Sequence, residues 1–287
     1  MAYDRIVVGT DGSAGSAAAV GWTSRVARVC GAEVTIVHGL APLLEHMFSI
    51  PPLASDELVA LVGRELTGAW SAPLREAGVQ IECLLVEDAA PTAVTSAARK
   101  RNVSLIVLGR HGHTRWSPPV IGGVVHKVLS DAVCPVVIVP TAWEDPSPDG
   151  PTDIVVGVDG SECSFAALDW AIRHAETFGL GVRVMTAVFT EAGGEVVWLA
   201  PADEEKASKA AEEELGRMLE KQRLETDVGL TMKITRGHPG SALVEESADA
   251  ALVAVGSRGL GSVAELFTGS TSHYVAARSR CPTVIVR

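Results

Sequence analysis

Short apolar runs alternate along the chain with longer segments whose apolar residues recur every three or four positions. In the second half, Leu168, Ile172 and Ala175 follow this helical spacing, and the run Val182–Val188 is rich in the β-branched residues typical of strands. The predicted strands there are Ile154–Val158, Val182–Val188, Leu230–Thr235, Ala251–Gly256 and Thr283–Val286, and the predicted helices are a segment around Phe165–Ala175, Ala202–Leu224, about Gly240–Asp249 and about Ser270–Arg278.

This alternation of strands and helices predicts an α/β fold. Strands that are apolar on both faces and separated by helices indicate a parallel sheet that is covered on both sides. Each half is therefore expected to be a Rossmann-like, doubly wound domain with five parallel strands. Such domains bind ligands beyond the carboxyl ends of the strands, at the point where the strand order reverses.

The chain contains this pattern twice. Ile6–Ser13 returns as Ile154–Ser161 at a shift of 148 residues with one difference, and Cys134–Val139 returns as Cys281–Val286 at a shift of 147. Because solenoid repeats are roughly 20 to 50 residues long, this period indicates a duplicated domain. We expect domains at residues 1–140 and 153–287, joined by a linker at 141–152 that contains three prolines.

Composition narrows the class of protein. A hydrophobic fraction of 47% with 21% charged residues is typical of a folded protein, and the net charge of −11 disfavours nucleic acid and anionic membranes as partners. The five cysteines are scattered without a CxxC pair, which favours reduced thiols over disulfides or zinc. With neither a signal-peptide pattern nor eighteen uninterrupted apolar residues, we expect a cytoplasmic protein.

The loops after the first and fourth predicted strands carry the candidate chemistry. In the second copy, Gly256-x-x-Gly259 is followed, after nine residues, by Gly269-Ser270 at the start of a predicted helix. Glycines allow close backbone approach, and a helix start offers unpaired N–H groups to a phosphate. Ser270, Thr271 and Ser272 add hydroxyls. The alternative interpretation is that Ser270 is simply an N-cap and the glycines are turn residues.

The whole pattern, Gly-x2-Gly-x9-Gly-Ser behind a strand in a chain with Asp11-Gly12-Ser13 after its first predicted strand, resembles the universal stress protein family in its tandem two-domain form. The resemblance covers residues 4–140 and 153–287. It implies a bacterial stress or dormancy regulator with strand order 3-2-1-4-5 in each domain. For the subfamily with this motif it implies bound ATP, expected as its magnesium complex, and no dedicated catalytic reaction.

The resemblance also implies which residues bind the nucleotide. In the second copy these are the backbone of Val158 and Ala187 for adenine, Asp159 for the ribose, Gly256 and Gly259 for ribose and phosphates, and Gly269, Ser270 and Thr271 for the phosphate tail. The matching positions of the first copy are Thr10, Gly39, Asp11, Gly109, Gly112, Gly122 and Gly123.

The first copy departs from the family pattern at one position. Gly123 stands where the family has Ser or Thr, so only backbone N–H groups remain for the phosphates. A hydrogen bond to a charged group is worth roughly 1.5–3 kcal/mol, so the first site is expected to bind about ten- to a hundredfold more weakly. His111, Arg115 and Lys127 are candidates to compensate electrostatically, although a surface role is the simpler interpretation for each.

Other chemistry receives less support. The chain lacks a P-loop lysine, so efficient ATP hydrolysis is not expected, and no catalytic residue is assigned. His111, His113 and His126 lack the helical spacing of a metal site. Two alternatives stay open: a slow Mg-dependent ATP hydrolase assisted by Asp11 or Asp159, and a protein-interaction module that has lost nucleotide binding.

Two further expectations concern packing and partners. Trp22 and Trp170 are equivalent residues on the first helices and are expected to pack against the sheet or the linker. The closing strands Val136–Val139 and Thr283–Val286 leave apolar edges, which invite pairing. The resemblance implies that the halves pair through these fifth strands as an intramolecular pseudo-dimer, and the same edge also allows a homodimer. The regulatory protein partner cannot be identified from the sequence.

Overall fold

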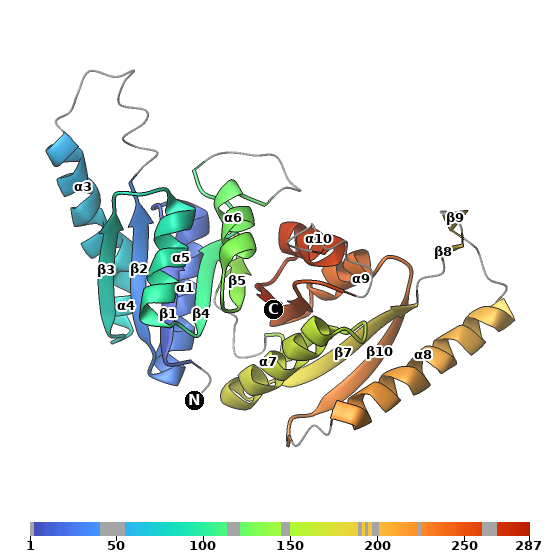
Figure 1. Ribbon diagram of the computed structural model, residues 1–287. Helices are drawn as coiled ribbons and strands as arrows, with labels where there is room; N and C mark the ends of the chain where they lie inside the picture. The colour runs from blue at the N-terminus through green and yellow to red at the C-terminus, as the bar shows by residue number, and fades with distance from the viewer. Residues whose placement is uncertain are drawn as a thin grey trace. The chain divides into compact units, whose positions relative to one another are not determined.

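The computed structural model describes residues 3–40, 55–113, 121–144, 150–188, 191–192, 195–196, 201–222, 226–259 and 269–287. The chain divides into two compact units, Met1–Asp145 and Pro146–Arg287. Both are α/β units with helices on the two faces of a parallel sheet (Figure 1), so the prediction of two tandem Rossmann-like units is confirmed. The predicted linker falls partly on residues outside the described ranges.

The first unit contains five strands in the spatial order β3-β2-β1-β4-β5. Its strands are β1 (Arg5–Gly9), β2 (Glu33–Gly39), β3 (Ile81–Val86), β4 (Leu105–Gly109) and β5 (Val136–Val139), and its helices are α1 (Ala14–Cys30), α3 (Ser55–Thr67), η2 (Ala69–Ser71), α4 (Ala72–Glu76), α5 (Ala90–Arg101) and α6 (Gly123–Asp131). All of its strand pairs are parallel. Helices α1 and α4 pack together, as do α5 and α6.

The second unit repeats this arrangement in the order β10-β7-β6-β11-β12. Its strands are β6 (Asp153–Gly157), β7 (Gly181–Val188), β10 (Leu230–Arg236), β11 (Leu252–Gly256) and β12 (Thr283–Val286), and its helices are α7 (Glu162–Phe178), α8 (Pro201–Gln222), α9 (Pro239–Glu246) and α10 (Ser270–Arg278). Two short antiparallel strands that the sequence did not predict, β8 (Glu191–Ala192) and β9 (Glu195–Val196), lie between β7 and α8. No helix of the described residues combines the length and apolar character needed to cross a membrane.

The central strands form the core because their side chains are apolar on both faces. Ile6, Val7 and Val8 of β1 are completely buried, as are Val155 and Val156 of β6. Such strands are stable only when helices cover both faces of the sheet. The core therefore fixes β1 beside β4 and β6 beside β11, and the loops that follow these strands emerge together at one edge.

The first helix of each unit begins and ends on local signals. Ser13 and Ser161 are N-caps whose hydroxyls accept hydrogen bonds from the N–H groups of Ser16 and Ser164. Both helices end at a glycine with a left-handed backbone, Gly31 and Gly179. These caps fix where each helix starts relative to the strand that precedes it.

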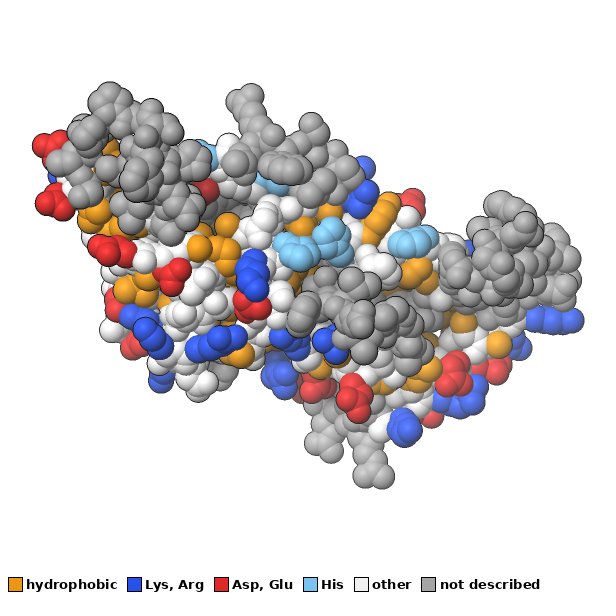
Figure 2. Space-filling view, turned by 45° about the horizontal axis from the view of Figure 1, so that its top comes forward, with side chains coloured by type: hydrophobic (Ala, Val, Ile, Leu, Met, Phe, Trp, Pro, Cys, Tyr) orange, Lys and Arg blue, Asp and Glu red, His pale blue; other side chains and the backbone are white. Residues whose placement is uncertain are grey.

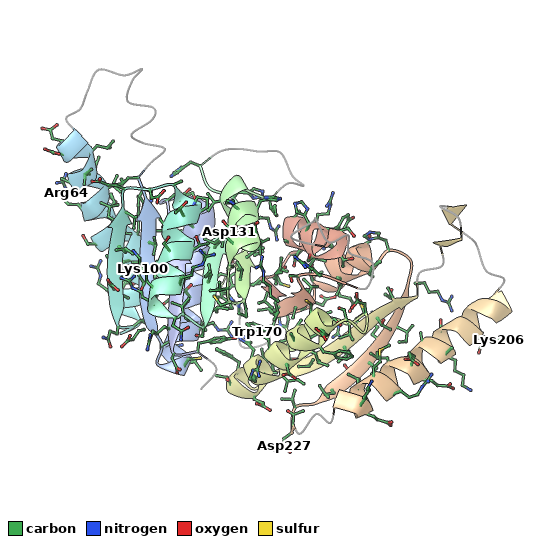
Figure 3. The ribbon with its side chains drawn as sticks, in the orientation of Figure 1. Arg64, Lys100, Asp131, Trp170, Lys206 and Asp227 are labelled. Atoms are coloured by element: carbon green, nitrogen blue, oxygen red, sulfur yellow. The ribbon has the colours of Figure 1, made fainter. Side chains whose placement is uncertain are left out.

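The two equivalent tryptophans are buried, with 4% of Trp22 and 5% of Trp170 exposed. Trp170 (Figure 3) stacks on His174 with ring centroids 5.0 Å apart, and His174 stacks on Phe178 at 4.3 Å. These rings lie along one side of α7 at i, i+4 and i+8. Trp170 therefore packs within the hydrophobic core of the second unit.

An ion-pair cluster joins three strands and a helix of the second unit. Arg183 on β7 contacts Asp153 Oδ2 at 2.8 Å and Glu246 Oε2 at 2.7 Å, and Lys233 Nζ contacts Glu246 Oε1 at 2.5 Å. Burial raises the pKa of Glu246, but hydrogen bonds from Lys233 and Arg183 and their charges lower it below its ordinary 4.5. The cluster therefore stabilises the unit at neutral pH.

We expect Arg183→Met to lower the free energy of unfolding by about 1–3 kcal/mol, because Glu246 and Asp153 lose hydrogen bonds to a charged partner. Because the folded pKa of Glu246 is depressed, its contribution is present above pH 4.5 and is lost as the pH falls through the folded value. Urea unfolding at pH 7 and at pH 3 measures both effects. Arg217→Met is the matched control, since Arg217 pairs with Glu214 on an exposed helix face. Equal effects of the two substitutions at pH 7 would contradict the prediction.

Candidate functional site

The loops that follow β1 and β4 lie side by side at the carboxyl edge of the first unit. In the register of these strands Val8 pairs with Val107, so the chain leaves the sheet at neighbouring places. The strand order reverses here, because β2 and β3 lie on one side of β1 and β4 and β5 on the other. The same reversal lies between β6 and β11. This is the position where doubly wound folds bind ligands.

An Asp-Gly-Ser turn fixes a carboxylate at this edge. Asp11 Oδ1 accepts hydrogen bonds from the Ser13 N–H at 3.0 Å and the Ser13 hydroxyl at 2.5 Å. In the second unit, Asp159 Oδ1 accepts the same bonds from Ser161 at 3.0 and 2.6 Å. One oxygen of each carboxylate therefore holds the turn in place, and the orientation of the other is determined with it.

Asp11 is ionised at neutral pH. Burial raises its pKa, but hydrogen bonds from the side chain and backbone of Ser13, a hydrogen bond from Ser16 and the nearby His113 together hold the pKa below its ordinary value. His113 also donates its backbone N–H to Asp11 Oδ2 at 3.3 Å, and its ring Nε2 contacts the Asp11 carbonyl at 2.8 Å. A charged carboxylate is a strong acceptor for a ligand hydroxyl such as that of a ribose.

The glycines of the loop after the fourth strand are required by close packing. A methyl group at Gly112 would lie 2.3 Å from Asp11 Oδ2, and one at Gly259 would lie 2.3 Å from Asp159 Oδ2. Gly109 similarly touches the backbone of Gly15 in the first turn of α1. The sequence predicted contact between these glycines and a ligand, whereas the structure shows that they first of all let this loop reach the aspartate turn.

The structure places Gly122 and Gly269 at the helix starts as N-caps with extended backbone. Ser270 is therefore the first helical residue of α10, and the interpretation of Ser270 as the N-cap is wrong. Within the described residues, the hydroxyls of Ser270 and Thr271 have no hydrogen-bond partner. Ser272 is buried and donates to the Gly269 carbonyl at 2.9 Å, so its hydroxyl serves the fold. Two hydroxyls and the N–H groups of the first turn of α10 are thus available to an anion.

The corresponding helix start in the first unit carries no hydroxyl. Gly123 is exposed, and a methyl group added to it would have no described neighbour within 4 Å, while Val124 is 38% exposed and Val125 is buried. Only the N–H groups of the first turn of α6 remain. The chemical difference between the two copies that the sequence indicated is therefore located at matching helix starts.

The residues expected to hold a base lie where β1, β2, β6 and β7 end. The N–H of Thr10 donates to Val37 O at 2.9 Å and that of Val158 donates to Met185 O at 2.8 Å, so neither is free for a ligand. Gly39 packs against the start of α5, where a methyl group would lie 2.7 Å from the Ala90 backbone. Ala187 pairs with Thr235 of β10. The N–H groups of Thr10 and Val158 are therefore not available to a base, and the Thr10 carbonyl is already in contact with His38 Nδ1.

Three residues that the sequence reasoning missed lie beside this edge. Trp70 packs on Gly12, where a methyl group would lie 2.5 Å from the indole, and its ring centroid is 5.3 Å from that of His38. Met218 takes the equivalent place in the second unit, with its Cε 3.2 Å from a methyl position on Gly160. Trp70 and Met218 are 148 residues apart, so the repeat period was the signal that could have paired them.

The proposed compensating charges receive limited support. Lys127 Nζ forms an i, i+4 ion pair with Asp131 Oδ2 at 3.1 Å on an exposed helix face, and Arg115 lies outside the described residues. Figure 2 shows acidic and basic side chains interspersed over the visible face. Among the described residues, no group of three or more His, Cys, Asp or Glu side chains is arranged to hold a metal ion.

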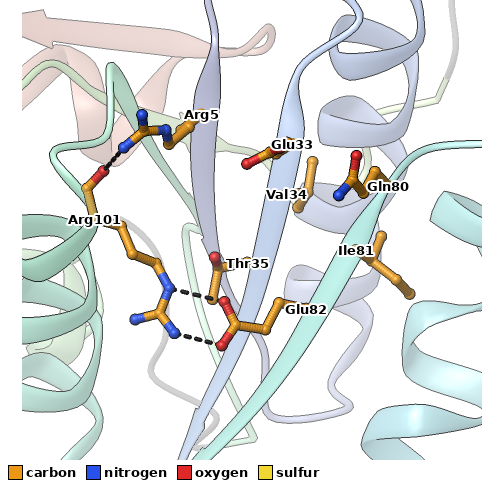
Figure 4. Close-up of a pocket in the computed structure, with 8 residues that line it drawn as sticks. All are labelled: Arg5, Glu33, Val34, Thr35, Gln80, Ile81, Glu82 and Arg101. Carbon is orange, nitrogen blue, oxygen red and sulfur yellow. Dashed lines mark hydrogen bonds and ion pairs between the residues drawn. The ribbon is translucent and has the colours of Figure 1, made fainter.

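A pocket of about 310 Å³ lies at the opposite, amino-terminal edge of the first sheet (Figure 4). Its main polar feature is the ion pair of Arg101 with Glu82, whose Nη2–Oε1 distance is 2.5 Å. At the same place in the second unit, Arg183 replaces Thr35 and forms the cluster described above. Since the pocket lies away from the strand carboxyl ends, we do not assign the nucleotide site to it.

Comparisons with known proteins agree with this architecture. The model of the Universal stress protein family matches residues 2–140 and 152–287. The chain is 30% identical to Universal stress protein Rv2623 of Mycobacterium tuberculosis, over 98% of this chain and 96% of that protein. It is 28% identical to a universal stress protein of Mycolicibacterium smegmatis, over 98% and 96%. A universal stress protein structure from Archaeoglobus fulgidus has the same fold, with a TM-score of 0.67 and 20% identity over 99% and 98% of the two chains.

Proposed function

Because the chain belongs to the universal stress protein family, we propose that it is a stress-response or dormancy regulator that binds ATP, with one site in each unit. One observation carries the proposal: the hydroxyls of Ser270 and Thr271 and the N–H groups of α10 stand at the same sheet edge as the turn carboxylate of Asp159. Such an arrangement suits a ligand with hydroxyls at one end and phosphates at the other.

The residues of the second unit suit distinct parts of the nucleotide. Asp159 Oδ2 would accept a ribose hydroxyl beside Gly259. The hydroxyls of Ser270 and Thr271 and the N–H groups of α10 would donate to the phosphates, with Gly269 allowing close approach. Gly256 packs against the backbone of Cys163 and would place the loop that contains Gly259. The carbonyls near Val158 and Ala187 would face the adenine edge. In the first unit, Asp11, Gly109, Gly112, Gly122 and Gly123 would act in the same way without the hydroxyls.

Binding without rapid turnover follows from the same residues. Phosphoryl transfer needs positive charge at the γ-phosphate and a positioned base. The chain has no P-loop lysine, and the turn aspartates already hold Ser13 and Ser161. Magnesium bound with the nucleotide would neutralise phosphate charge. We therefore propose a regulator whose occupancy is the signal, located in the cytoplasm, rather than an efficient hydrolase.

Identifying the nucleotide that co-purifies with the protein tests this function directly. The freshly purified protein is denatured, and any nucleotide in the supernatant is identified by chromatography. We expect ATP, because a site without turnover retains what it binds. ADP as the main product would favour the hydrolase, and the absence of nucleotide together with no thermal shift on adding Mg-ATP would overturn nucleotide binding altogether.

A further inference from the structure

The two units differ on the side of the Asp-Gly-Ser turn where Gly12 and Gly160 lie. In the first unit this side contains the indole of Trp70 and the imidazole of His38, and in the second unit it contains Met218 and Thr186 at the corresponding positions. The helix starts differ in the opposite sense, with Gly123 in the first unit and Ser270 in the second. The two units therefore differ in two places, beside the Asp-Gly-Ser turn and at the helix start.

The position of Trp70 follows from a break between helices. α3 ends at Thr67, Gly68 has a non-helical backbone, and η2 turns the chain so that the indole reaches the Asp-Gly-Ser turn. Gly12 has a φ of 78° and no side chain, which leaves space for the ring. The indole is half-buried, so part of this flat aromatic surface is accessible next to Asp11.

His38 is the second member of this aromatic pair. Its Nδ1 lies 2.7 Å from the carbonyl of Thr10, and because a carbonyl only accepts, Nδ1 carries the proton. Only 9% of the residue is exposed, and within the described part of the chain its Nε2 has no hydrogen-bond partner. A residue that served packing alone would need no polar atom there. A buried acceptor without a donor is unfavourable, so this imidazole is kept in place at a cost in stability.

We propose that Trp70 and His38 form a base-binding wall, so that the first unit holds an adenine nucleoside or monophosphate mainly by its base, whereas the second unit holds ATP mainly by its phosphates. This inference rests on the proposed function. It assigns a different class of adenine ligand to each of the two sites. Base–aromatic stacking contributes as much as hydrogen bonds to phosphate, so it can dominate where hydroxyls are missing. Trp70 contacts the base, and His38 is a positioning residue that fixes the indole.

The test isolates the first unit within the full chain. Ser270→Glu places a carboxylate at the exposed first residue of α10, which suits the helix dipole and repels phosphates from the second unit. AMP and ATP are then titrated calorimetrically into this variant. We expect one remaining site whose affinities for the two nucleotides agree within about threefold, because phosphates contribute little there. An affinity for ATP more than about tenfold above that for AMP would overturn the proposal.

Trp70→Met in the Ser270→Glu chain tests the wall itself. We expect it to weaken AMP and ATP binding equally, by about tenfold, because stacking is lost while the phosphate end is unchanged. Methionine already occupies this place against Gly160 in the second unit, so the substitution suits the local geometry, and a thermal melt verifies the fold. The reverse change, Met218→Trp in the otherwise unaltered chain, is expected to tighten AMP binding at the second unit. Unchanged AMP affinity in Trp70→Met overturns the proposal.

A spectroscopic measurement separates positioning from folding for His38. The emission of Trp70 is the difference between the spectra of the parent and Trp70→Met chains, and AMP is expected to change it. In His38→Thr, which carries the residue of the second unit, the AMP-induced change is expected to disappear while the melting temperature stays close to that of the parent. A full AMP-induced change in Trp70 emission in that variant would show that His38 does not contribute to the base-binding wall. Failure of the wild-type chain to bind any adenine nucleotide would overturn the proposed function as well. Nucleotide binding that is unaffected by substitution of Trp70 would overturn this inference alone.

Discussion

Gly269→Ala is expected to weaken ATP binding at the second unit by up to about a hundredfold while the protein stays folded. The backbone of Gly269 has a φ of −67°, which alanine adopts without strain. The added methyl would lie 3.6–3.7 Å from Ser257, Arg258 and Ser272, between the loop after β11 and the start of α10. This is the space in which we place the phosphates, so the methyl interferes with the ligand rather than with the protein.

Isothermal titration of Mg-ATP, together with a thermal melt of each protein, measures this effect. Gly216→Ala is the matched control, because Gly216 lies on α8 of the same unit with nothing within 4 Å of the methyl position. Its binding should equal that of the wild-type chain. ATP binding by Gly269→Ala at wild-type affinity would show that the phosphates do not occupy this space.

Exchanging the residues at the two helix starts is expected to exchange the affinities of the two sites for ATP. Ser270→Gly removes a hydroxyl donor and should weaken the second site by about ten- to a hundredfold. Gly123→Ser supplies the donor to the first unit, where the exposed position has space for it, and should tighten that site by a similar factor. Both residues occupy the first position of a helix capped by glycine, so the exchange leaves the caps unchanged.

Titrations of ATP into the two single variants and the double variant decide the matter. The double variant should show two sites in the reversed order of strength. AMP serves as the control ligand, since one phosphate makes fewer contacts with the helix start and its affinity should change less. Equal changes for AMP and ATP, or no change in either single variant, would show that these positions do not contact the phosphate tail.

Much of the candidate site was predictable from short segments. The turn Asp159-Gly160-Ser161 and the cap by Ser161 lie within three residues, and their geometry follows from local hydrogen bonding. Predicted strand Thr283–Val286 and helix Ser270–Arg278 have the bounds of β12 and α10 because periodicity is also a local property. The sequence left open the alternative that Ser270 is the N-cap, because a serine before a helix is a good cap and only the backbone geometry distinguishes it from Gly269.

Contacts between distant segments were not predictable in this way. Gly112 must be glycine because Asp11, 101 positions earlier in the sequence, lies against it. Trp70 reaches Gly12 because of the irregular backbone at Gly68, for which no periodic pattern exists. The hydrogen bond of His38 to Thr10 depends on the pairing of β1 with β2.

By itself, the sequence determined that the protein contains two copies of one α/β unit, where the main strands and helices of the second copy run, and that the copies differ at Gly123 and Ser270. These properties depend on residues that are near one another along the chain. Only the tertiary structure decided why the loop glycines are needed, which hydroxyls at the start of α10 lack a protein partner, and that Trp70 and His38 form an aromatic pair beside the first Asp-Gly-Ser turn. Those properties depend on close approach between segments that sheet order and side-chain packing bring together.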